Sequence, residues 1–455
     1  MEKTIAAIST APAPGGIGIV RISGGEAFAV AEKVFRGVSG KKVSQMKGYT
    51  AQLGGAYTPG GEKLDDVVAL VYRGPKSYTG EDVVELSCHG GLYMTKRLLQ
   101  LVLDAGAAPA GPGEFTRRAF LNGKMDLAQA EAVMGLISAS GEQARKAALA
   151  GSTGVLSRKI ESIKQGLLEQ AAHLAAWADF PEEDVPQVEE AALLEGIRQG
   201  EKALEELLQG FDRGRMYREG LVTVIAGRPN AGKSTLMNLL SGCQRSIVTQ
   251  YAGTTRDVVE ETVMVAGVPL RLADTAGIRD TDDPVESIGV QAARQRLETA
   301  QLVLAVFDSS QALEKEDWEL MDALENVPAI AIVNKSDLPT RMDVEAIQKR
   351  FEKTVSLSAA TGEGLAALEQ ALSEILDTKD FHPQEGVLFT QRQRMDAQTA
   401  LDSLREGEQA LVLGLTLDAV TVCVEDALHA LAALTGEQVS EEIVDRVFEE
   451  FCVGK

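Results

Sequence analysis

One loop restricts what this chain can fold into more than any other segment: Gly227-Arg228-Pro229-Asn230-Ala231-Gly232-Lys233-Ser234. It matches the pattern G-x-x-x-x-G-K-[ST] in full and lies between the apolar run Leu221 to Ala226 and a helix-like sequence, which is the context that the pattern requires. The backbone N–H groups of such a loop hold phosphate, Lys233 neutralises phosphate oxygens, and Ser234 ligates Mg²⁺. The residues expected at the phosphates are Asn230, Ala231, Gly232, Lys233, Ser234 and Thr235.

The sequence around this loop predicts the fold class of its domain. Apolar runs alternate with helical segments over residues 221–376, and continuous apolar runs are typical of parallel strands buried on both faces. We therefore expect a doubly wound α/β P-loop domain of the Ras-like type. Its strands are expected at Leu221 to Ala226, Leu270 to Ala273, Leu302 to Phe307, Ala329 to Val333 and Val355 to Leu357.

The segment Asn334-Lys335-Ser336-Asp337 predicts the base of the nucleotide. The Asp337 carboxylate can accept hydrogen bonds from the guanine ring N–H and the exocyclic amine. Adenine lacks both donors, and each partner lost by a buried carboxylate costs about 1–3 kcal/mol. We therefore expect GTP and not ATP. A second loop on the base side is expected at Ser358, Ala359 and Ala360.

Two more segments lie in the order expected of a GTPase. Thr255, within Gly253 to Asp257, supplies a hydroxyl for Mg²⁺ and the γ-phosphate, and Asp274 follows the second predicted strand, where a carboxylate can hold Mg²⁺ through water. The residues of this second segment are Asp274, Thr275, Ala276 and Gly277. Ras-type GTPases carry a water-orienting glutamine directly afterwards, whereas this chain has Ile278. Candidates for that role are Asp280, Asp282, Asp283 and Glu286, any of which can instead be solvated surface.

The whole chain of 455 residues is too long for one core, and a prior of about one domain per ~150 residues suggests three domains. Residues 1 to about 120 alternate β-like runs with glycine-rich turns and one helical stretch near Leu92 to Ala105, which predicts a compact α+β domain. Helical sequence flanks the P-loop domain on both sides. We therefore expect that domain to be inserted into one helical domain, with hinges at Gly210 to Gly220 and His382 to Gly386.

Two caps are predicted in the helical blocks. Asp126 is expected to cap the first helix of the block that extends to about residue 210, and Ser440 the last helix of the block from about residue 392 to 451. That last helix should have one apolar face, formed by Ile443, Val444, Val447, Phe448 and Phe451.

Charge and cysteine content restrict partners and location. The net charge of −22 argues against a protein that coats nucleic acid through bulk electrostatics. Residues 1–125 hold 15 basic and 11 acidic side chains, a net of +4, so an anionic ligand other than the nucleotide is expected there.

The four cysteines form no C-x-x-C pair, which favours a reducing compartment. No secretion signal or membrane-spanning stretch is evident. We therefore expect a cytoplasmic protein without a membrane partner.

Several segments carry a resemblance over essentially the whole chain. They are T-I-A-A-I-S-T-A-P…G-G-I-G-I-V-R-I-S-G at the start, P-G-E-F-T-R-R-A-F-L-N-G-K-M-D-L-A-Q-A-E-A, the P-loop with G-T-T-R-D and D-T-A-G-I-R, and F-C-V-G-K at the end. Together they closely resemble the tRNA modification GTPase family MnmE, also called TrmE. The resemblance implies an N-terminal folate-binding and dimerisation domain, a helical domain in two parts and an inserted G domain. The N-terminal domain is expected at 1–122, the two parts of the helical domain at 123–217 and 379–455, and the G domain at 218–378.

The resemblance also implies a reaction and partners. Members of the family act on tRNA as homodimers with the flavoprotein MnmG, in a heterotetramer or larger assembly. They install an aminomethyl or carboxymethylaminomethyl group on C5 of the wobble uridine, with a tetrahydrofolate derivative (5,10-methylene- or 5-formyl-) as cofactor and the methylene form as donor. Implied folate contacts are Arg21, Glu85, Lys124 and Lys455. The lysines can pair with the polar ends of a folate, and Glu85 can accept from a pterin amide and amine. Cys452 stays open as a nucleophile or general acid.

For the G domain the resemblance implies K⁺-dependent hydrolysis. A cation beside the phosphates neutralises developing charge. The implied K⁺ ligands are Asn230, Thr249, Tyr251 and Thr254, with Thr249 and Thr254 also near the nucleotide. Glu286 matches the family's catalytic acid, and it forms the implied catalytic set with Lys233 and Thr255. The alternative is a GTP-switched ribosome-assembly factor without modification activity, although no KH-like G-x-x-G clamp or basic helical tail is evident.

Overall fold

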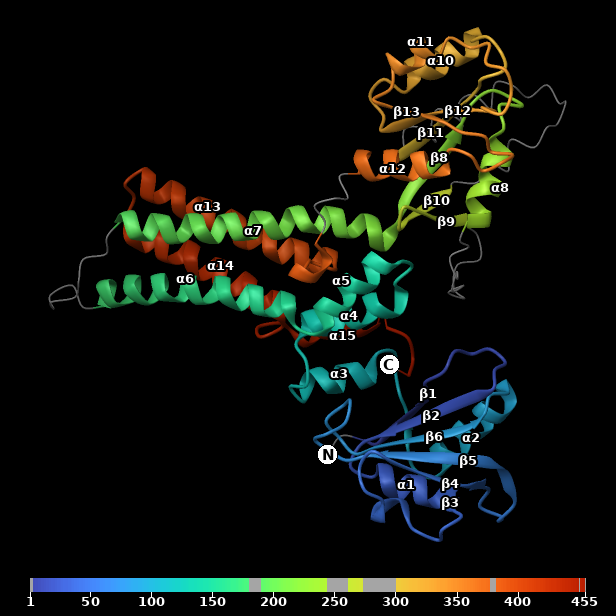
Figure 1. The fold of residues 1–455 in the computed structure, drawn as a ribbon. Helices are drawn as coiled ribbons and strands as arrows, with labels where there is room; N and C mark the ends of the chain where they lie inside the picture. Colours follow the sequence, from blue (N-terminus) through green and yellow to red (C-terminus); the bar gives the residue numbers. More distant parts are fainter. Residues whose placement is uncertain are drawn as a thin grey trace. The chain divides into compact units, whose positions relative to one another are not determined.

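The computed structural model describes residues 3–179, 190–243, 261–272, 300–376, 382–449 and 451–454. The chain forms two compact units. The first comprises residues 1–134, 157–200 and 395–455, and the second comprises residues 135–156 and 201–394. The colours of Figure 1 follow the chain, so that the separate segments of each unit can be traced. Within the described ranges, no helix combines the length and the apolar character that crossing a bilayer requires.

The N-terminal part of the first unit is a seven-stranded sheet in the order β3-β4-β5-β6-β2-β1-β7. β1 and β7 pair in parallel, and the other neighbours are antiparallel. β1, β2, β5 and β6 lie where the sequence predicts β-like runs, at 4–9, 17–23, 66–72 and 82–87, whereas β3, β4 and β7 were not predicted. The bounds are β1 (Ile5–Ile8), β2 (Ile17–Ser23), β3 (Phe35–Gly37), β4 (Thr50–Tyr57), β5 (Lys63–Tyr72), β6 (Val83–His89) and β7 (Ala108–Pro109).

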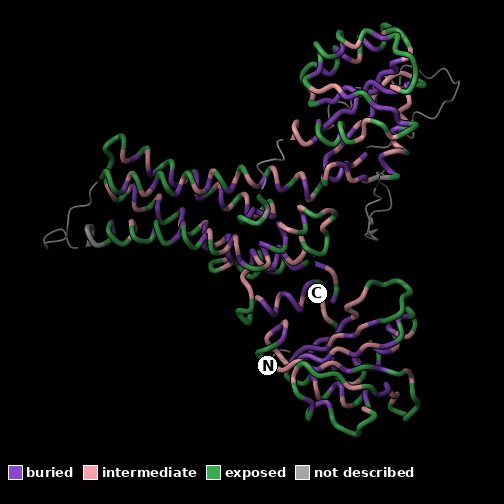
Figure 2. Tube along the Cα trace, in the orientation of Figure 1, coloured by how far each residue is buried: buried purple, intermediate pink, exposed green. Residues whose placement is uncertain are grey.

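One face of this sheet forms the core of the N-terminal domain. Helices α1 (Ala27–Val34) and α2 (Leu92–Asp104) contribute to the same cluster of buried residues as alternate side chains of β2, β5 and β6. Buried residues, purple in Figure 2, therefore alternate with less buried ones along these strands. Because side chains alternate across a strand, Arg21, Tyr72 and Glu85 lie on the opposite face. The helix predicted near Leu92 to Ala105 is confirmed.

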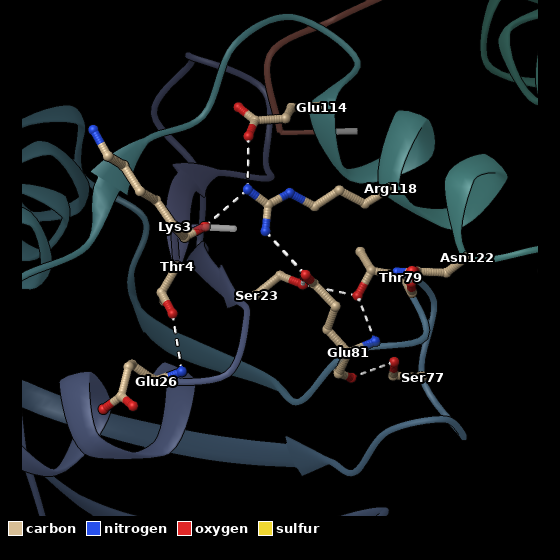
Figure 3. A network of polar contacts seen from close by, with 10 residues as sticks. All are labelled: Lys3, Thr4, Ser23, Glu26, Ser77, Thr79, Glu81, Glu114, Arg118 and Asn122. Atoms are coloured by element: carbon tan, nitrogen blue, oxygen red, sulfur yellow. Dashed lines mark hydrogen bonds and ion pairs between the residues drawn. The ribbon is translucent and has the colours of Figure 1, made fainter. Parts of the chain in front are cut away.

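A polar network joins α3 (Glu114–Leu121) to this sheet (Figure 3). The Arg118 side chain is only 5% exposed, and its Nη1 lies 3.1 and 3.2 Å from the two carboxylate oxygens of Glu81. Its Nη2 donates to Glu114 Oε1 at 2.9 Å and to the Lys3 carbonyl oxygen at 2.8 Å. Glu81 Oε2 also accepts from the Ser23 hydroxyl at 2.6 Å. Charged groups this deeply buried persist because each has several partners.

Long helices make up the helical part of the chain. The predicted cap at Asp126 is present: Gln129 N donates to Asp126 Oδ1 at 2.8 Å, and Asp126 N donates to Gln129 Oε1 at 2.9 Å. Ile443 N similarly donates to Ser440 Oγ at 3.4 Å. The bounds are α4 (Leu127–Ser138), α5 (Glu142–Ser152), α6 (Val155–Asp179), α7 (Glu190–Glu219), α13 (Gln391–Val412), α14 (Leu417–Thr435) and α15 (Glu441–Glu449).

Two predictions for these helices were wrong. Ile443 was assigned to the apolar face of α15 but is 42% exposed, whereas Val444 and Phe448 are buried. The amphipathic face is therefore narrower than predicted. The hinge expected over Gly210 to Gly220 also fails, because α7 continues through Gly210 to Glu219. Gly210 and Gly214 each weaken the helix by only about 1 kcal/mol, and burial of Phe211 favours continuation.

The second unit contains a six-stranded sheet in the order β13-β12-β11-β8-β10-β9. Its strands are parallel except for β9, which pairs antiparallel with β10. The doubly wound α/β prediction is confirmed, and β9 is the one described strand here that was not predicted. The bounds are β8 (Leu221–Ala226), β9 (Glu261–Val265), β10 (Val268–Leu272), β11 (Leu302–Asp308), β12 (Ala329–Asn334) and β13 (Lys353–Ser356), with helices α8 (Lys233–Cys243), α10 (Lys315–Ala323), α11 (Val344–Gln348) and α12 (Leu365–Ile375) and the 3₁₀ turn η3 (Pro383–Glu385).

Candidate functional site

The predicted phosphate loop connects β8 to α8, and its glycines are required by close backbone approaches. Gly227 has a φ of +152°, and a Cβ there would lie 2.3 Å from the Val306 carbonyl oxygen of the neighbouring strand β11. Gly232 has a φ of +97°, and its Cβ would lie 2.1 Å from Asn334 Nδ2. Asn230 also adopts a left-handed φ of +61°. These positions fix a compact loop directly before the N-terminus of α8.

Lys233 is the first residue of α8 and turns back over the loop. Its Nζ donates to the carbonyl oxygens of Gly227 at 2.8 Å and Arg228 at 2.7 Å. The ammonium group is therefore held above the backbone that would surround phosphate oxygens. Ser234 and Thr235 follow in the first turn of α8, and both are exposed. The Ser234 hydroxyl is thus accessible at the helix start, where a Mg²⁺ ligand is needed.

A second anchor of the loop was missed by sequence reasoning. Arg228 Nε lies 2.9 Å from Asp317 Oδ2, and its Nη1 lies 2.7 Å from Glu314 Oε2. The Arg228 side chain is 11% exposed and that of Asp317 is 3% exposed. These ion pairs join the phosphate loop to α10. Because Arg228 occupies one of the variable x positions of the motif, the pattern itself gave no sign of this role.

The guanine-type segment is joined to the phosphate loop by one buried amide. Asn334, at the end of β12, is 2% exposed. Its Nδ2 donates to the Ala231 carbonyl oxygen at 2.8 Å, and its Oδ1 accepts from Ala359 N at 2.9 Å. Asn334 therefore links three predicted parts of the site. The exposed Asp337 carboxylate is oriented by the buried Ser358 hydroxyl, which donates to Asp337 Oδ1 at 2.6 Å. Ala360 lies next in this loop and is exposed.

Lys335 has an unpredicted acidic partner. It adopts a φ of +61°, and its Nζ lies 2.6 Å from Asp308 Oδ2 at the end of β11. Burial alone raises the pKa of Asp308, but hydrogen bonds from Lys335 and Ser310 and the Lys335 charge outweigh it, so that its pKa lies below the usual value. The Asp308 carboxylate is thus ionised and holds the Lys335 stem in place. A carboxylate directly after a buried strand was the available sequence signal.

Ten of the predicted site residues lie outside the described residues, and their predictions therefore stand as made from the sequence. They are Thr249, Tyr251, Thr254, Thr255, Asp274, Thr275, Ala276, Gly277, Glu286 and Lys455.

Two of the predicted folate residues meet on adjacent strands of the N-terminal sheet. Arg21 of β2 and Glu85 of β6 are in direct register, and both Nε and Nη2 of Arg21 lie 2.9 Å from Glu85 Oε1. Tyr72 donates its hydroxyl to Glu85 Oε2 at 3.3 Å. Burial and the Glu85 charge raise the pKa of Tyr72, so the phenol stays a donor at neutral pH. These side chains line a cavity of about 150 Å³ together with Tyr78 and Val83.

The last described residue, Gly454, contacts Arg21, one of the side chains that line this cavity. The Gly454 carbonyl oxygen accepts from Arg21 Nη1 at 3.3 Å and from Ser9 Oγ at 3.1 Å. Gly454 has a φ of +96°, and a Cβ there would lie 2.2 Å from the Ile8 carbonyl oxygen. Only glycine allows this approach of the C-terminal tail to β1. Gly454 is thereby held by packing against residues near the start of the chain.

The other predicted residues of this region do not all converge. Lys124 follows α3 and donates to the Pro75 carbonyl oxygen at 3.0 Å, but it is not among the residues that line the cavity. Cys452 is partly exposed, and its carbonyl oxygen accepts from Gly113 N at 3.4 Å. A cavity of this size holds one polar ring or one carboxylate, since sites for whole cofactors are typically ~300 Å³ or larger. It presents a carboxylate, a guanidinium and a phenol.

Two protein-family descriptions match this chain. The description "GTP-binding protein TrmE N-terminus" matches residues 4–124, and "MnmE helical domain" matches residues 127–452. The chain is 43% identical over 459 residues to the tRNA modification GTPase MnmE of Alkaliphilus oremlandii and 45% identical over 457 residues to that of Symbiobacterium thermophilum. Each alignment covers 100% of this chain and 100% of the relative. The MnmE of Lactococcus lactis subsp. cremoris strain SK11 is 42% identical, with 99% and 98% covered.

Proposed function

The chain belongs to the MnmE family of tRNA modification GTPases, and from this premise we propose that it couples K⁺-dependent GTP hydrolysis to modification of tRNA. The proposed product is an aminomethyl or carboxymethylaminomethyl group on C5 of the wobble uridine. MnmG is the proposed flavoprotein partner, and methylenetetrahydrofolate is the proposed source of one carbon. The observation that carries the proposal furthest is the approach of the C-terminal tail to the Arg21–Glu85 cavity, because it builds a polar site from both ends of the chain. The bounds 1–122, 123–217, 218–378 and 379–455 stand as the proposed domains.

For the nucleotide, the described geometry supports specific roles. We assign the phosphates to the loop from Asn230 to Thr235, and the guanine base to Asp337 with the loop that begins at Ser358. The Asn334 amide supports this assignment because it holds the phosphate loop and the base loop at fixed separation. The exposed hydroxyl of Ser234 suits Mg²⁺, with Thr255 as the second proposed protein ligand.

We propose that K⁺ supplies charge compensation beside the phosphates, bound by Asn230, Thr249, Tyr251 and Thr254. Of these, Asn230 is described; it is exposed and in a left-handed conformation within the phosphate loop. Glu286 is the proposed acid that orients the attacking water. The hypothesis predicts much faster GTP hydrolysis in KCl than in NaCl at equal ionic strength. Equal rates in the two salts would remove the cation from the mechanism.

The Arg21–Glu85 cavity suits the polar ring of a reduced folate. Glu85 Oε2 retains acceptor capacity for one amide or amine N–H, the half-buried Arg21 guanidinium can donate, and the Tyr72 phenol oxygen can accept. We propose that the remainder of the ligand extends from the cavity toward Lys124 and Lys455. When bound, a methylenetetrahydrofolate supplies a one-carbon unit at the formaldehyde oxidation level, and the residues of this chain hold it in place.

Calorimetric titration of the full chain with tetrahydrofolate tests the folate site. Glu85→Gln should weaken binding by about ten- to a hundredfold, because a hydrogen bond to a charged group is worth about 1.5–3 kcal/mol. Glu62→Gln is the matched control, since Glu62 is an exposed carboxylate on the same domain. Absence of any binding heat for the unaltered chain would contradict the folate proposal and favour the GTP-switched ribosome-assembly alternative.

A homodimer is proposed through the sheet face that lies opposite α1 and α2. Leu53 and Val68 are directly opposite each other on β4 and β5, and they are 57% and 38% exposed. Ile17 on β2 is 64% exposed. Exposed apolar side chains grouped on one sheet face are typical of an interaction surface. A second copy of this chain covering that face would also enclose the adjoining folate cavity.

A further inference from the structure

A compact group of positive charges occupies the β3 edge of the N-terminal sheet. Between residues 33 and 57 the chain has five basic side chains and no acidic one. All five are exposed. We define the basic segment as Lys33, Arg36, Lys41, Lys42 and Lys47. It contrasts with the chain as a whole, whose net charge is −22.

The basic segment is rigidly attached to the domain. Val43 and Met46 alternate with its lysines and are 1% and 4% exposed, so they anchor the segment in the core. Arg73, which directly follows β5, donates to the Ser44 carbonyl oxygen at 2.5 Å and to the Met46 carbonyl oxygen at 3.1 and 2.9 Å. The lysines are therefore displayed on fixed backbone, and little backbone freedom is lost when a ligand binds.

Among the described residues no carboxylate forms an ion pair with the basic segment, although the charge of Glu32 interacts with that of Lys42. Lys33 Nζ donates to a neutral group, the Ala105 carbonyl oxygen, and Arg36 stacks on the Tyr57 ring at 4.6 Å. Glu32 is the adjacent carboxylate in sequence, and its Oε1 accepts two hydrogen bonds from Ser44. Elsewhere on the described surface, cations commonly face carboxylates. Examples are Arg117–Asp445, Arg145–Glu142, Lys164–Glu437, Arg198–Glu408, Arg215–Glu219 and Arg350–Asp322.

We propose that the basic segment binds the phosphate backbone of tRNA. A chain this acidic repels a polyanion on average, so contact requires a local surface of opposite charge. Clustered Lys and Arg on one edge provide that surface, and screening over about 8 Å at physiological salt leaves their local attraction intact. The inference rests on the proposed function, since that function makes tRNA the polyanion that this chain must contact.

Contacts between lysine and phosphate can be detected from the dependence of the binding affinity on salt concentration. Binding of a protein to nucleic acid weakens linearly with the logarithm of salt concentration, and each phosphate contact adds about 0.7–0.9 to the slope. The triple variant Lys41→Ala, Lys42→Ala, Lys47→Ala removes three such contacts without touching the core. We expect its slope to be smaller by about two to three and its affinity at low salt to fall about tenfold or more.

The experiment is a fluorescence-anisotropy titration of labelled tRNA with the full chain at several NaCl concentrations, alone and with the flavoprotein partner. The matched control is Lys202→Ala, Lys315→Ala, Lys349→Ala, which removes three exposed charges from elsewhere. The control should change affinity by less than about twofold. Replacement of Lys41, Lys42 and Lys47 by arginine should retain the slope, because phosphate contact needs the charge.

Two results overturn the inference. One is an unchanged slope and affinity for the Lys41/Lys42/Lys47 alanine variant in both titrations, while the unaltered chain binds tRNA. The other is normal tRNA binding by that variant with loss of the flavoprotein, which would assign the surface to an acidic protein. Failure of the proposed function has a different signature, since then the unaltered chain itself shows no tRNA affinity with or without the partner.

Discussion

Two neighbouring arginines on α3 give a matched test of how burial determines the contribution of an ion pair to stability. Arg118 and Arg117 each lie about 3 Å from a carboxylate. Arg118 is 5% exposed and faces Glu81, whose side chain is 17% exposed (Figure 3). Arg117 is 31% exposed, and its partner Asp445 is 56% exposed. Substitution of each arginine by methionine keeps most of the side-chain stem and removes the charge.

The expected losses of stability differ because water screens the exposed ion pair much more than the buried one. Removal of one partner from a buried pair costs about 3–5 kcal/mol, and an exposed pair contributes about 0–1 kcal/mol. Since Glu81 and Glu114 keep some contact with water, we take the lower bound of about 3 kcal/mol for Arg118→Met. At about 1.4 kcal/mol per factor of ten, this corresponds to roughly 150-fold faster opening of the N-terminal sheet. Arg117→Met should give less than about fivefold.

The assay is hydrogen–deuterium exchange of the full chain, followed in peptides from β1, β2 and α3. Exchange through local opening reports the free energy of that region without requiring the whole multidomain chain to unfold in two states. If Arg118→Met leaves protection within about fivefold of the unaltered chain, or if the two variants behave alike, the argument that the Arg118 network stabilises this domain is refuted.

Further predictions concern the G domain. Arg228→Met should weaken binding of a fluorescent GDP analogue by about tenfold, because the loop loses its ion pairs with α10, and unchanged affinity would contradict an anchoring role. Glu286→Ala should lower GTP turnover while leaving GTP affinity intact, with Glu325→Ala, at an exposed carboxylate of the same domain, as control; a collapse of binding would indicate a structural role. The pKa of Asp308 lies below its unfolded value, so its stabilisation is present at neutral pH and is lost as pH falls below about 4. Asp308→Asn should therefore flatten the acid side of the stability curve measured by urea denaturation, whereas an unchanged pH profile would show that the pair with Lys335 contributes nothing.

The elements that the sequence predicted are those determined by local pattern. β11 and β12 are nearly continuous apolar runs because both of their faces are buried, whereas β8 alternates buried and half-buried positions. The phosphate loop has a fixed spacing set by backbone geometry. β4 was missed because Gly54 and Gly55 interrupt its pattern. Their role is visible only in the fold, where a Cβ at Gly54 would lie 2.2 Å from the Arg36 carbonyl oxygen of β3.

The parts of the site that escaped prediction depend on long-range pairing. The Arg228–Asp317 pair and the Lys335–Asp308 pair join residues 89 and 27 positions apart, and neither acidic partner belongs to a motif. Arg21 and Glu85 were assigned through resemblance, and the register of β2 with β6 explains why these two residues meet. The network of Arg118 with Glu81 had no local signal at all.

The central claim is that this chain takes part in modification of the tRNA wobble uridine. The most direct measurement is mass spectrometry of wobble nucleosides in tRNA from cells that lack the protein, compared with cells in which it is restored. The account predicts loss of the C5 aminomethyl or carboxymethylaminomethyl group in its absence and recovery on restoration. Fully modified wobble uridines in cells without the protein would contradict it.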